Sequence, residues 1–183
     1  MRIISGLFGL VLGALFAFSA TAQPLEGPVL ITVSGNITNP NRGPVDEFHD
    51  AFFISQDVEF EKAKAFDLSS LKALGFHTVT ATYEDWPGKL EFEGPLLKDV
   101  LDTAGAEGKV IAVKALDGYA PEIEMQDVEK YPVILALKVN GKYLGLGGRG
   151  PAWVVYPRDD FDVLKEEDDS KYVWSTYLIE VKQ

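Results

Sequence analysis

Short runs of β-branched and aromatic residues, each closed by a turn signal, recur along most of this 183-residue chain. Such residues favour strands because a branched or flat side chain packs well on a pleated surface. We expect strands at 29–33, 77–83, 90–92, 110–116, 133–139, 153–156 and 172–181. Helical patterns are fewer and short. The pattern therefore predicts an α+β domain, built mostly from mixed β-sheet with short helices.

Two short helices and one hairpin interrupt the strands. Asp67 is placed to cap a helix that ends at Gly75, with three leucines facing inward. A second helix is expected to carry Pro95 in its first turn and to end before Gly105. Asn140-Gly141 predicts a two-residue hairpin turn.

Two stretches have no regular pattern. Residues 48–66 are mixed and aromatic, and the sequence assigns them no element. Residues 159–169 are strongly acidic, which is typical of a solvated loop.

The first 22 residues read as a targeting signal. Arg2 precedes an apolar stretch over 3–18, and the segment ends with Ala20-Thr21-Ala22. A basic start, an apolar stretch and small residues at the end are typical of a secretory signal peptide. We therefore expect a signal peptide at 1–22, a single domain at 23–183 and, in a bacterium, a periplasmic product. An uncleaved membrane anchor is the alternative, although the run is short for a span of about 20 residues.

Charge and cysteine content exclude several classes of function. Acidic residues outnumber basic ones by 28 to 17, so no nucleic-acid partner is expected. The chain has no cysteine, which excludes disulfides, cysteine zinc sites, iron–sulfur clusters and thiol nucleophiles. His49 and His77 form no spaced metal motif, and no acid–base pair can be selected from the carboxylates. We predict no catalytic residues and no metal site.

A glycine-rich segment at 145–150 matches the pattern G-x-G-x-x-G. The dinucleotide fingerprint requires a helix after the glycines, because the helix N-terminus holds the pyrophosphate. Here Pro151 and a β-prone run follow instead. The segment is interpreted as a flexible loop that lets backbone approach a ligand.

Four segments match one family pattern in order, at 92–101, 115–119, 132–141 and 150–157, with Trp174 downstream. Together they resemble the molybdopterin-binding domain of the sulfite-oxidase family. The resemblance implies the sulfite-oxidase-like fold and recognition of a pterin.

The chain departs from that family at the metal. Sulfite-oxidase-type enzymes bind molybdenum through a cysteine on the stretch equivalent to about Thr80 to Tyr83, and this chain has none. The family's basic residues for the cofactor phosphate are mostly missing as well. Arg149 remains, and Trp153 stands where the family often has arginine. The resemblance therefore does not imply molybdenum catalysis.

The chain is most similar to a small, secreted, cysteine-free branch of the family. The resemblance implies that the protein binds a reduced pterin of the tetrahydropterin type. It also implies a partner, the periplasmic part of a membrane-bound protein that makes and degrades cyclic di-GMP. Two alternatives stay open: a molybdopterin-dependent oxidoreductase that lacks the usual cysteine, and a structural domain without a ligand.

Binding a flat pterin needs an aromatic face for stacking and a carboxylate for paired hydrogen bonds. Trp86 beside two acidic residues could supply both, and Asp117 matches the family's pterin-edge aspartate. Molybdopterin is the less favoured ligand, because its phosphate needs several basic partners. The predicted ligand-binding residues are Trp86, Asp117, Tyr119, Arg149, Trp153, Glu84 and Tyr83.

Most of these residues also have an ordinary structural interpretation. Trp86 could cap the core from its loop, and Asp117 precedes glycine as in a common turn. Tyr119 and Trp153 could pack in the core, and Arg149 could be an exposed loop charge.

Overall fold

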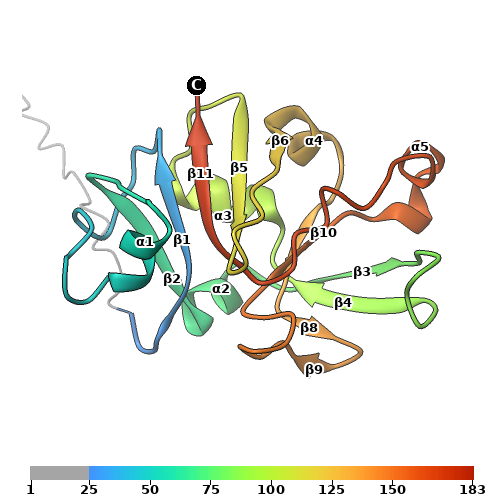
Figure 1. Cartoon of the computed structure of the whole chain (residues 1–183). Helices are drawn as coiled ribbons and strands as arrows, with labels where there is room; N and C mark the ends of the chain where they lie inside the picture. The colour runs from blue at the N-terminus through green and yellow to red at the C-terminus, as the bar shows by residue number, and fades with distance from the viewer. Residues whose placement is uncertain (1–24) are drawn as a thin grey trace, which may run out of the picture.

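The computed structural model describes residues 25–183, so the predicted signal peptide at 1–22 lies outside the described residues. Within 25–183 no helix combines the length and the apolar character needed to cross a membrane. Figure 1 shows the elements in space. In chain order they are β1 (Val29–Gly35), α1 (Ala51–Ser55), β2 (Ala63–Asp67), α2 (Leu68–Ala73), β3 (His77–Ala81), β4 (Leu90–Gly94), α3 (Leu97–Ala104), β5 (Val110–Ala115), β6 (Glu122–Glu124), α4 (Met125–Lys130), β7 (Ile134–Ala136), β8 (Lys138–Val139), β9 (Lys142–Tyr143), β10 (Trp153–Val155), the 3₁₀ turn η1 (Arg158–Asp160), α5 (Asp162–Lys165) and β11 (Thr176–Lys182).

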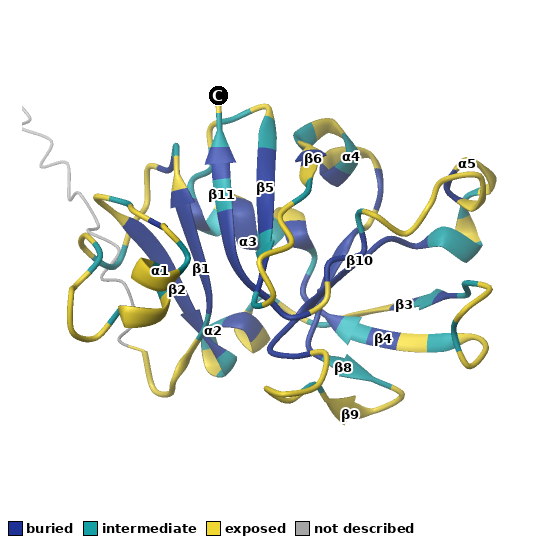
Figure 2. Ribbon diagram, in the orientation of Figure 1, coloured by how far each residue is buried: buried dark blue, intermediate teal, exposed yellow. Residues whose placement is uncertain are grey.

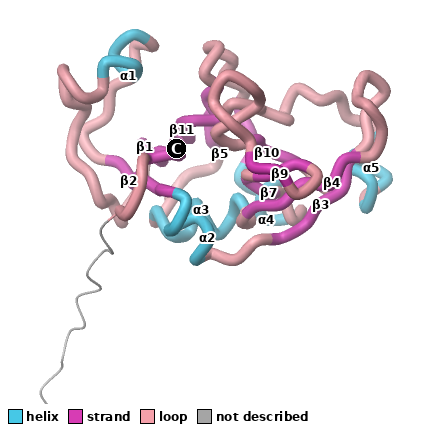
Figure 3. Tube along the Cα trace, turned by 90° about the horizontal axis from the view of Figure 1, so that it is seen from below, coloured by secondary structure: helices cyan, strands magenta, loops and turns pink. Residues whose placement is uncertain are grey.

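The largest sheet has five strands in the order β2-β1-β11-β5-β6. β1 and β11 run parallel, and the other neighbours are antiparallel. The view from below places α1 on one face of this sheet and α2 and α3 on the other (Figure 3). The central strands are buried along most of their length (Figure 2), as their apolar sequences require.

The second half of the molecule contains a four-stranded sheet, β3-β4-β8-β9, and a pair of strands, β10-β7. The single strand predicted at 133–139 is wrong, because β7 pairs with β10 while β8 pairs with β4. The chain passes close to Gly94 at Leu135, and between β7 and β8 its partner on the other side changes from β10 to β9. A Cβ atom at Gly94 would lie 2.1 Å from the Leu135 carbonyl oxygen, so only glycine permits this approach.

Helix α2 begins as predicted. The Asp67 carboxylate accepts the Ser70 backbone N–H at 2.8 Å, and the Ser70 hydroxyl accepts the Asp67 N–H at 2.9 Å, which completes a capping box. Asp67 also accepts the backbone N–H groups of Glu26 and Gly27. These donors, that of Ser70 foremost, hold the pKa of Asp67 well below its usual range.

Helix α3 starts at Leu97 and has Leu96 as its N-cap, so Pro95 lies just before the helix and not in its first turn. Its predicted end is confirmed, because Gly105 adopts the left-handed conformation with φ 66°. The hairpin turn is also confirmed, with positive φ at Asn140 and Gly141 between β8 and β9.

Residues 159–169 contain more structure than the predicted solvated loop. They carry part of η1 and all of α5, and Leu164 is buried beneath their acidic side chains. Residues 48–66, which the sequence left open, form α1 and most of β2. The predicted fold class, an α+β domain of mixed sheet with short helices, is confirmed.

Candidate functional site

Five parts of the chain meet around a cavity of about 200 Å³. They are the loop after β3, the link between β5 and β6, the glycine-rich loop at 145–150, strand β10 and the chain between α5 and β11. The lining residues are Trp86, Tyr119, Arg149, Trp153, Asp169, Ser170, Tyr172 and Trp174. Four of the seven residues predicted from the sequence, Trp86, Tyr119, Arg149 and Trp153, are therefore brought together here.

Two tryptophans form the inner wall of the cavity. The rings of Trp86 and Trp153 meet edge to face, with centroids 5.3 Å apart, and Trp153 also packs against Phe92 at 5.2 Å. The indole N–H of Trp153 donates to the Tyr172 carbonyl at 3.2 Å. Trp153 is thus a core residue that also lines the cavity, and the half-buried Trp86 has the same double role.

Arg149 supplies the positive charge of the site. Its guanidinium carbon lies 4.7 Å from the Trp153 ring centroid and 5.7 Å from that of Trp174. Ser175 fixes the glycine-rich loop in place. Its N–H donates to the Arg149 carbonyl, and its hydroxyl donates to the Gly148 carbonyl. In the part of the chain that the structure describes, no carboxylate pairs with Arg149, so its donors are available to a ligand.

A second cavity, of about 380 Å³, adjoins the first across Trp86, Arg149 and Trp153. Its other lining residues are Asp85, Pro87, Leu90, Val139 and Leu144. The shared tryptophan and arginine side chains therefore have accessible space on two sides.

Two tyrosines hold the segment at 168–170 over the site. The Tyr83 hydroxyl donates to the Asp168 carbonyl at 3.2 Å, and the Tyr119 hydroxyl donates to the Ser170 carbonyl at 2.9 Å. Burial raises the pKa of Tyr83, so this phenol stays protonated as a donor. Tyr83 lines neither cavity, and its position supports the wall indirectly.

Sequence reasoning missed the other four lining residues, Asp169, Ser170, Tyr172 and Trp174, and Asp169 is the charged one among them. It lines the 200 Å³ cavity, and among residues 25–183 neither a hydrogen bond nor an ion pair engages its carboxylate. In the sequence it stands inside an acidic run of the kind that usually faces solvent. The two tyrosine tethers, which connect positions more than 50 residues apart, and the ion pair of Lys171 with Asp127 hold its segment beside the tryptophans.

The two predicted carboxylates lie outside both cavities. Asp117 is exposed, and its side chain accepts the Tyr119 N–H at 3.0 Å as in an ordinary turn. Glu84 is exposed beside Asp85, which lines the second cavity. Direct ligand binding by Asp117 or Glu84 stays a prediction.

The stretch equivalent to the family's metal-binding position is occupied by a polar network. The Thr82 N–H and hydroxyl both donate to the Asp159 carboxylate, each at 3.1 Å, and Arg158 donates to the Thr82 carbonyl at 2.9 Å. No thiolate is available, since the sequence has no cysteine, and thiolate is the soft ligand that holds molybdenum in sulfite-oxidase-type enzymes. The side chains at this position therefore do not fit molybdenum ligation.

The two cavities also have too few basic side chains to bind the phosphate of molybdopterin. Arg149 is the single lysine or arginine among the described residues that line the two cavities. Residues 25–183 also contain no group of three or more His, Asp or Glu side chains that could hold a metal ion.

Comparison with known proteins identifies the fold and the family. The crystal structure of the sulfane dehydrogenase SoxCD from Paracoccus pantotrophus matches 84% of this chain with a TM-score of 0.59 and 17% identity. This chain covers only 38% of the SoxCD chain. Curated proteins give no match. A family model described as the oxidoreductase molybdopterin binding domain matches residues 42–158, so the chain belongs to this family, as its resemblance to sulfite oxidases implies.

Proposed function

We propose that this protein binds a free reduced pterin in the cavity between Trp86, Trp153 and Asp169, without molybdenum. The observation that carries the proposal is the meeting of aromatic faces, one unpaired carboxylate and one unpaired arginine in a single cavity. Each of these groups recognises a different part of a pterin.

The tryptophans provide surface for the flat ring system. Aromatic pairs gain stability beyond area burial when they stack with an offset or meet edge to face. The exposed ring of Trp174 and the half-buried ring of Trp86 border the cavity on separate segments. A planar ligand between these segments would therefore be held by rings that do not depend on each other for position.

Asp169 and Arg149 provide complementary polar contacts. The amidine-like edge of a pterin carries N–H donors that a carboxylate can accept in a paired, charge-assisted arrangement. The adjacent pterin carbonyl needs a donor, which the guanidinium of Arg149 can supply. Both residues line the same cavity, which supports a ligand with a donor edge beside an acceptor.

The charge of the chain supports a ligand without phosphate. Its formal net charge of -11 would become -12 after loss of Arg2 with a signal peptide. Molybdopterin carries a phosphate that needs several basic partners, whereas a free reduced pterin does not.

We further propose that the protein acts in the periplasm as a pterin sensor. Its partner would be the periplasmic part of a membrane-bound cyclic di-GMP cyclase–phosphodiesterase, as the resemblance to the secreted, cysteine-free branch implies. A ligand that contacts both Trp86 and Asp169 would tie the loop after β3 to the segment at 168–170. A partner that contacts these two surface segments would bind the ligand-bound and the ligand-free protein differently.

Calorimetric titration with tetrahydrobiopterin under anaerobic conditions tests the proposal. One molecule should bind per chain, and Trp86→Ala should weaken binding at least about tenfold, the effect of losing roughly 1.4 kcal/mol of stacking. Phe48→Ala is the matched control, because Phe48 is 85% exposed and lines neither cavity. Equal affinity of the Trp86→Ala variant and the wild type would place the ligand elsewhere.

The family match supports a second candidate function, a molybdopterin-dependent oxidoreductase that holds its cofactor without cysteine. Metal analysis of protein taken from the periplasm separates the two functions. One molybdenum per chain, with reduction of a sulfoxide, would support the enzyme and overturn the sensor.

A further inference from the structure

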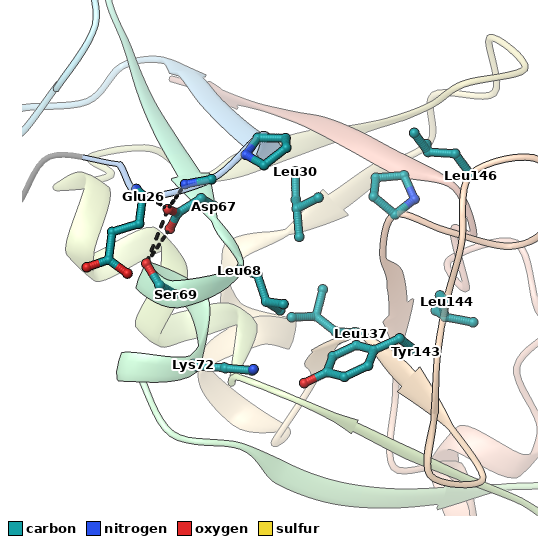
Figure 4. Close-up of a pocket in the computed structure, with 13 residues that line it drawn as sticks. Glu26, Leu30, Asp67, Leu68, Ser69, Lys72, Leu137, Tyr143, Leu144 and Leu146 are labelled. Carbon is teal, nitrogen blue, oxygen red and sulfur yellow. Dashed lines mark hydrogen bonds between the residues drawn. The ribbon is translucent and has the colours of Figure 1, made fainter.

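A groove of about 550 Å³ is lined in part by the glycine-rich loop and shares no lining residue with the 200 Å³ cavity between the tryptophans. It lies between the start of β1, helix α2 and the β8–β9 hairpin (Figure 4). Its volume falls within the range of about 300–1,000 Å³ that is usual for small-molecule sites. Its lining residues are Glu26, Gly27, Pro28, Leu30, Asp67, Leu68, Ser69, Lys72, Leu137, Tyr143, Leu144, Leu146 and Pro151.

The walls of the groove are mainly aliphatic. Five leucines face it from four separate parts of the fold: β1, α2, the link between β7 and β8, and the stretch at 144–146 that leads from β9 into the glycine-rich loop. Leu146 is 74% exposed and, together with the other four leucines, forms a contiguous apolar surface of the kind that marks ligand-binding grooves. An aliphatic ligand would remove this apolar surface from water, which favours binding.

One end of the groove carries positive charge. Lys72 on α2 extends toward Tyr143 on β9, with its ammonium nitrogen 5.5 Å from the ring centroid (Figure 4). The Lys138 ammonium lies 5.3 Å from the same ring but is paired with Glu93 at 3.0 Å. Lys72 pairs with no carboxylate of residues 25–183, so its charge is available in an otherwise acidic chain.

The acidic groups of the groove do not neutralise Lys72. The Asp67 carboxylate is buried and already accepts hydrogen bonds from Ser70, Glu26 and Gly27. The Glu26 carboxylate points away from the leucines (Figure 4). An anion that enters beside Lys72 therefore meets an unpaired ammonium and the Tyr143 hydroxyl at the same end.

We infer that this groove is a second ligand site, for a free aliphatic monocarboxylate. The hydrocarbon chain lies against the leucines, and the carboxylate binds between Lys72 and Tyr143. This inference goes beyond pterin binding, because the groove shares no lining residue with the 200 Å³ cavity and only Leu144 with the 380 Å³ cavity.

Isothermal titration of the full-length mature protein with decanoate, below its micelle concentration, tests the inference. We expect saturable binding of one decanoate per chain, and binding of uncharged 1-decanol at least about fivefold more weakly. Lys72→Glu and Lys72→Gln should each weaken decanoate binding about fivefold or more, as expected for loss of one partly exposed charge contact.

Lys142→Glu is the matched control, because Lys142 is next to Tyr143 on β9 but does not line the groove. This variant should bind decanoate within about twofold of wild type, and Trp86→Ala should bind it normally while losing the pterin. Absence of saturable binding, equal affinities for decanoate and decanol, or equal losses in the Lys72 and Lys142 variants would overturn the inference. Concentration-dependent dimerisation abolished by Lys72→Glu would also overturn it, in favour of self-association through the groove.

Discussion

The five-stranded sheet and the aromatic site are built by different kinds of contact. In the sheet, neighbouring strands exchange backbone hydrogen bonds and bury apolar side chains such as Ile31, Val33 and Ile179. At the site, side chains of Tyr83 and Tyr119 reach backbone carbonyls 85 and 51 residues away. The sheet therefore sets global stability, while the site depends on a few side-chain tethers that can change without unfolding the protein.

The difference also separates what each region can tolerate. A buried aliphatic residue of β11 has no role in ligand contact, and an exposed acid such as Asp169 contributes little to stability. Changes in the sheet should lower the free energy of unfolding and spare ligand affinity. Changes at exposed residues of the site such as Asp169 should do the reverse.

The largest expected effect is in the sheet. Ile179→Ala should lower the free energy of unfolding by about 3 kcal/mol, because the fully buried side chain leaves a cavity in the central strand. Urea unfolding followed by circular dichroism measures the loss, and Ile179→Val, with an expected cost of about 1 kcal/mol, is the graded control. Pterin affinity of the folded fraction should stay unchanged. A parallel loss of affinity would contradict the independence of the two regions.

A smaller stability effect is expected at the cap of α2. Asp67→Ala should cost about 2 kcal/mol, since it removes the cap and leaves the N–H groups of Glu26 and Gly27 without their acceptor. Asp102→Ala, which removes an exposed ion pair with Lys98, should cost under about 0.5 kcal/mol.

The same cap predicts a pH dependence. The pKa of Asp67 is lowered in the folded state, so its contribution is complete above the unfolded pKa of about 3.9 and is lost as the pH falls below that value. Both the folded and the unfolded pKa of Asp67 lie at about 4 or below. The stability difference between wild type and Asp67→Ala should therefore be constant from about pH 5 to 7. A difference that already shrinks at pH 6 would exclude Asp67 as the titrating group.

In the site, Asp169→Asn should weaken binding of tetrahydrobiopterin about tenfold, because an amide cannot accept both hydrogen bonds of the pterin edge. The free energy of unfolding should change by less than about 0.5 kcal/mol. Asp168→Asn is the neighbouring control, since Asp168 lies outside both cavities and an amide oxygen can still accept the Ser170 N–H. If Asp117→Asn gives the larger loss, the carboxylate that recognises the pterin is Asp117.

The smallest effect is expected at a tether. Tyr119→Phe removes the hydrogen bond to the Ser170 carbonyl and keeps the ring, at a cost of about 0.5 kcal/mol because the side chain is 47% exposed. Hydrogen exchange at residues 168–171 should become faster, while exchange in β11 stays unchanged. Unchanged exchange at 168–171 would show that the tether does not order this wall of the cavity.

The sequence patterns predicted the framework well because its signals are local. The capping residue Asp67, the left-handed Gly105 and the Asn140-Gly141 turn each act within a few residues of their position. The single strand predicted at 133–139 was wrong because β7 pairs with β10 and β8 pairs with β4 and β9, and the pairing with β10 and β4 is set by residues outside the local sequence.

The site was only partly predictable for the same reason. Trp86, Arg149 and Trp153 were selected from loop position and resemblance, and they meet in one cavity. Asp169 could not be selected, because an acidic residue among acidic neighbours has no distinguishing local pattern. Its place beside the tryptophans depends on hydrogen bonds from Tyr83 and Tyr119 across the fold.

We propose that this member of the molybdopterin-binding family holds a pterin without its metal. Native mass spectrometry of protein taken directly from the periplasm, combined with metal analysis of the same sample, tests this most directly. We expect one reduced pterin per chain, no molybdenum and loss of the pterin in Trp86→Ala. A bound molybdopterin with one molybdenum per chain would contradict it.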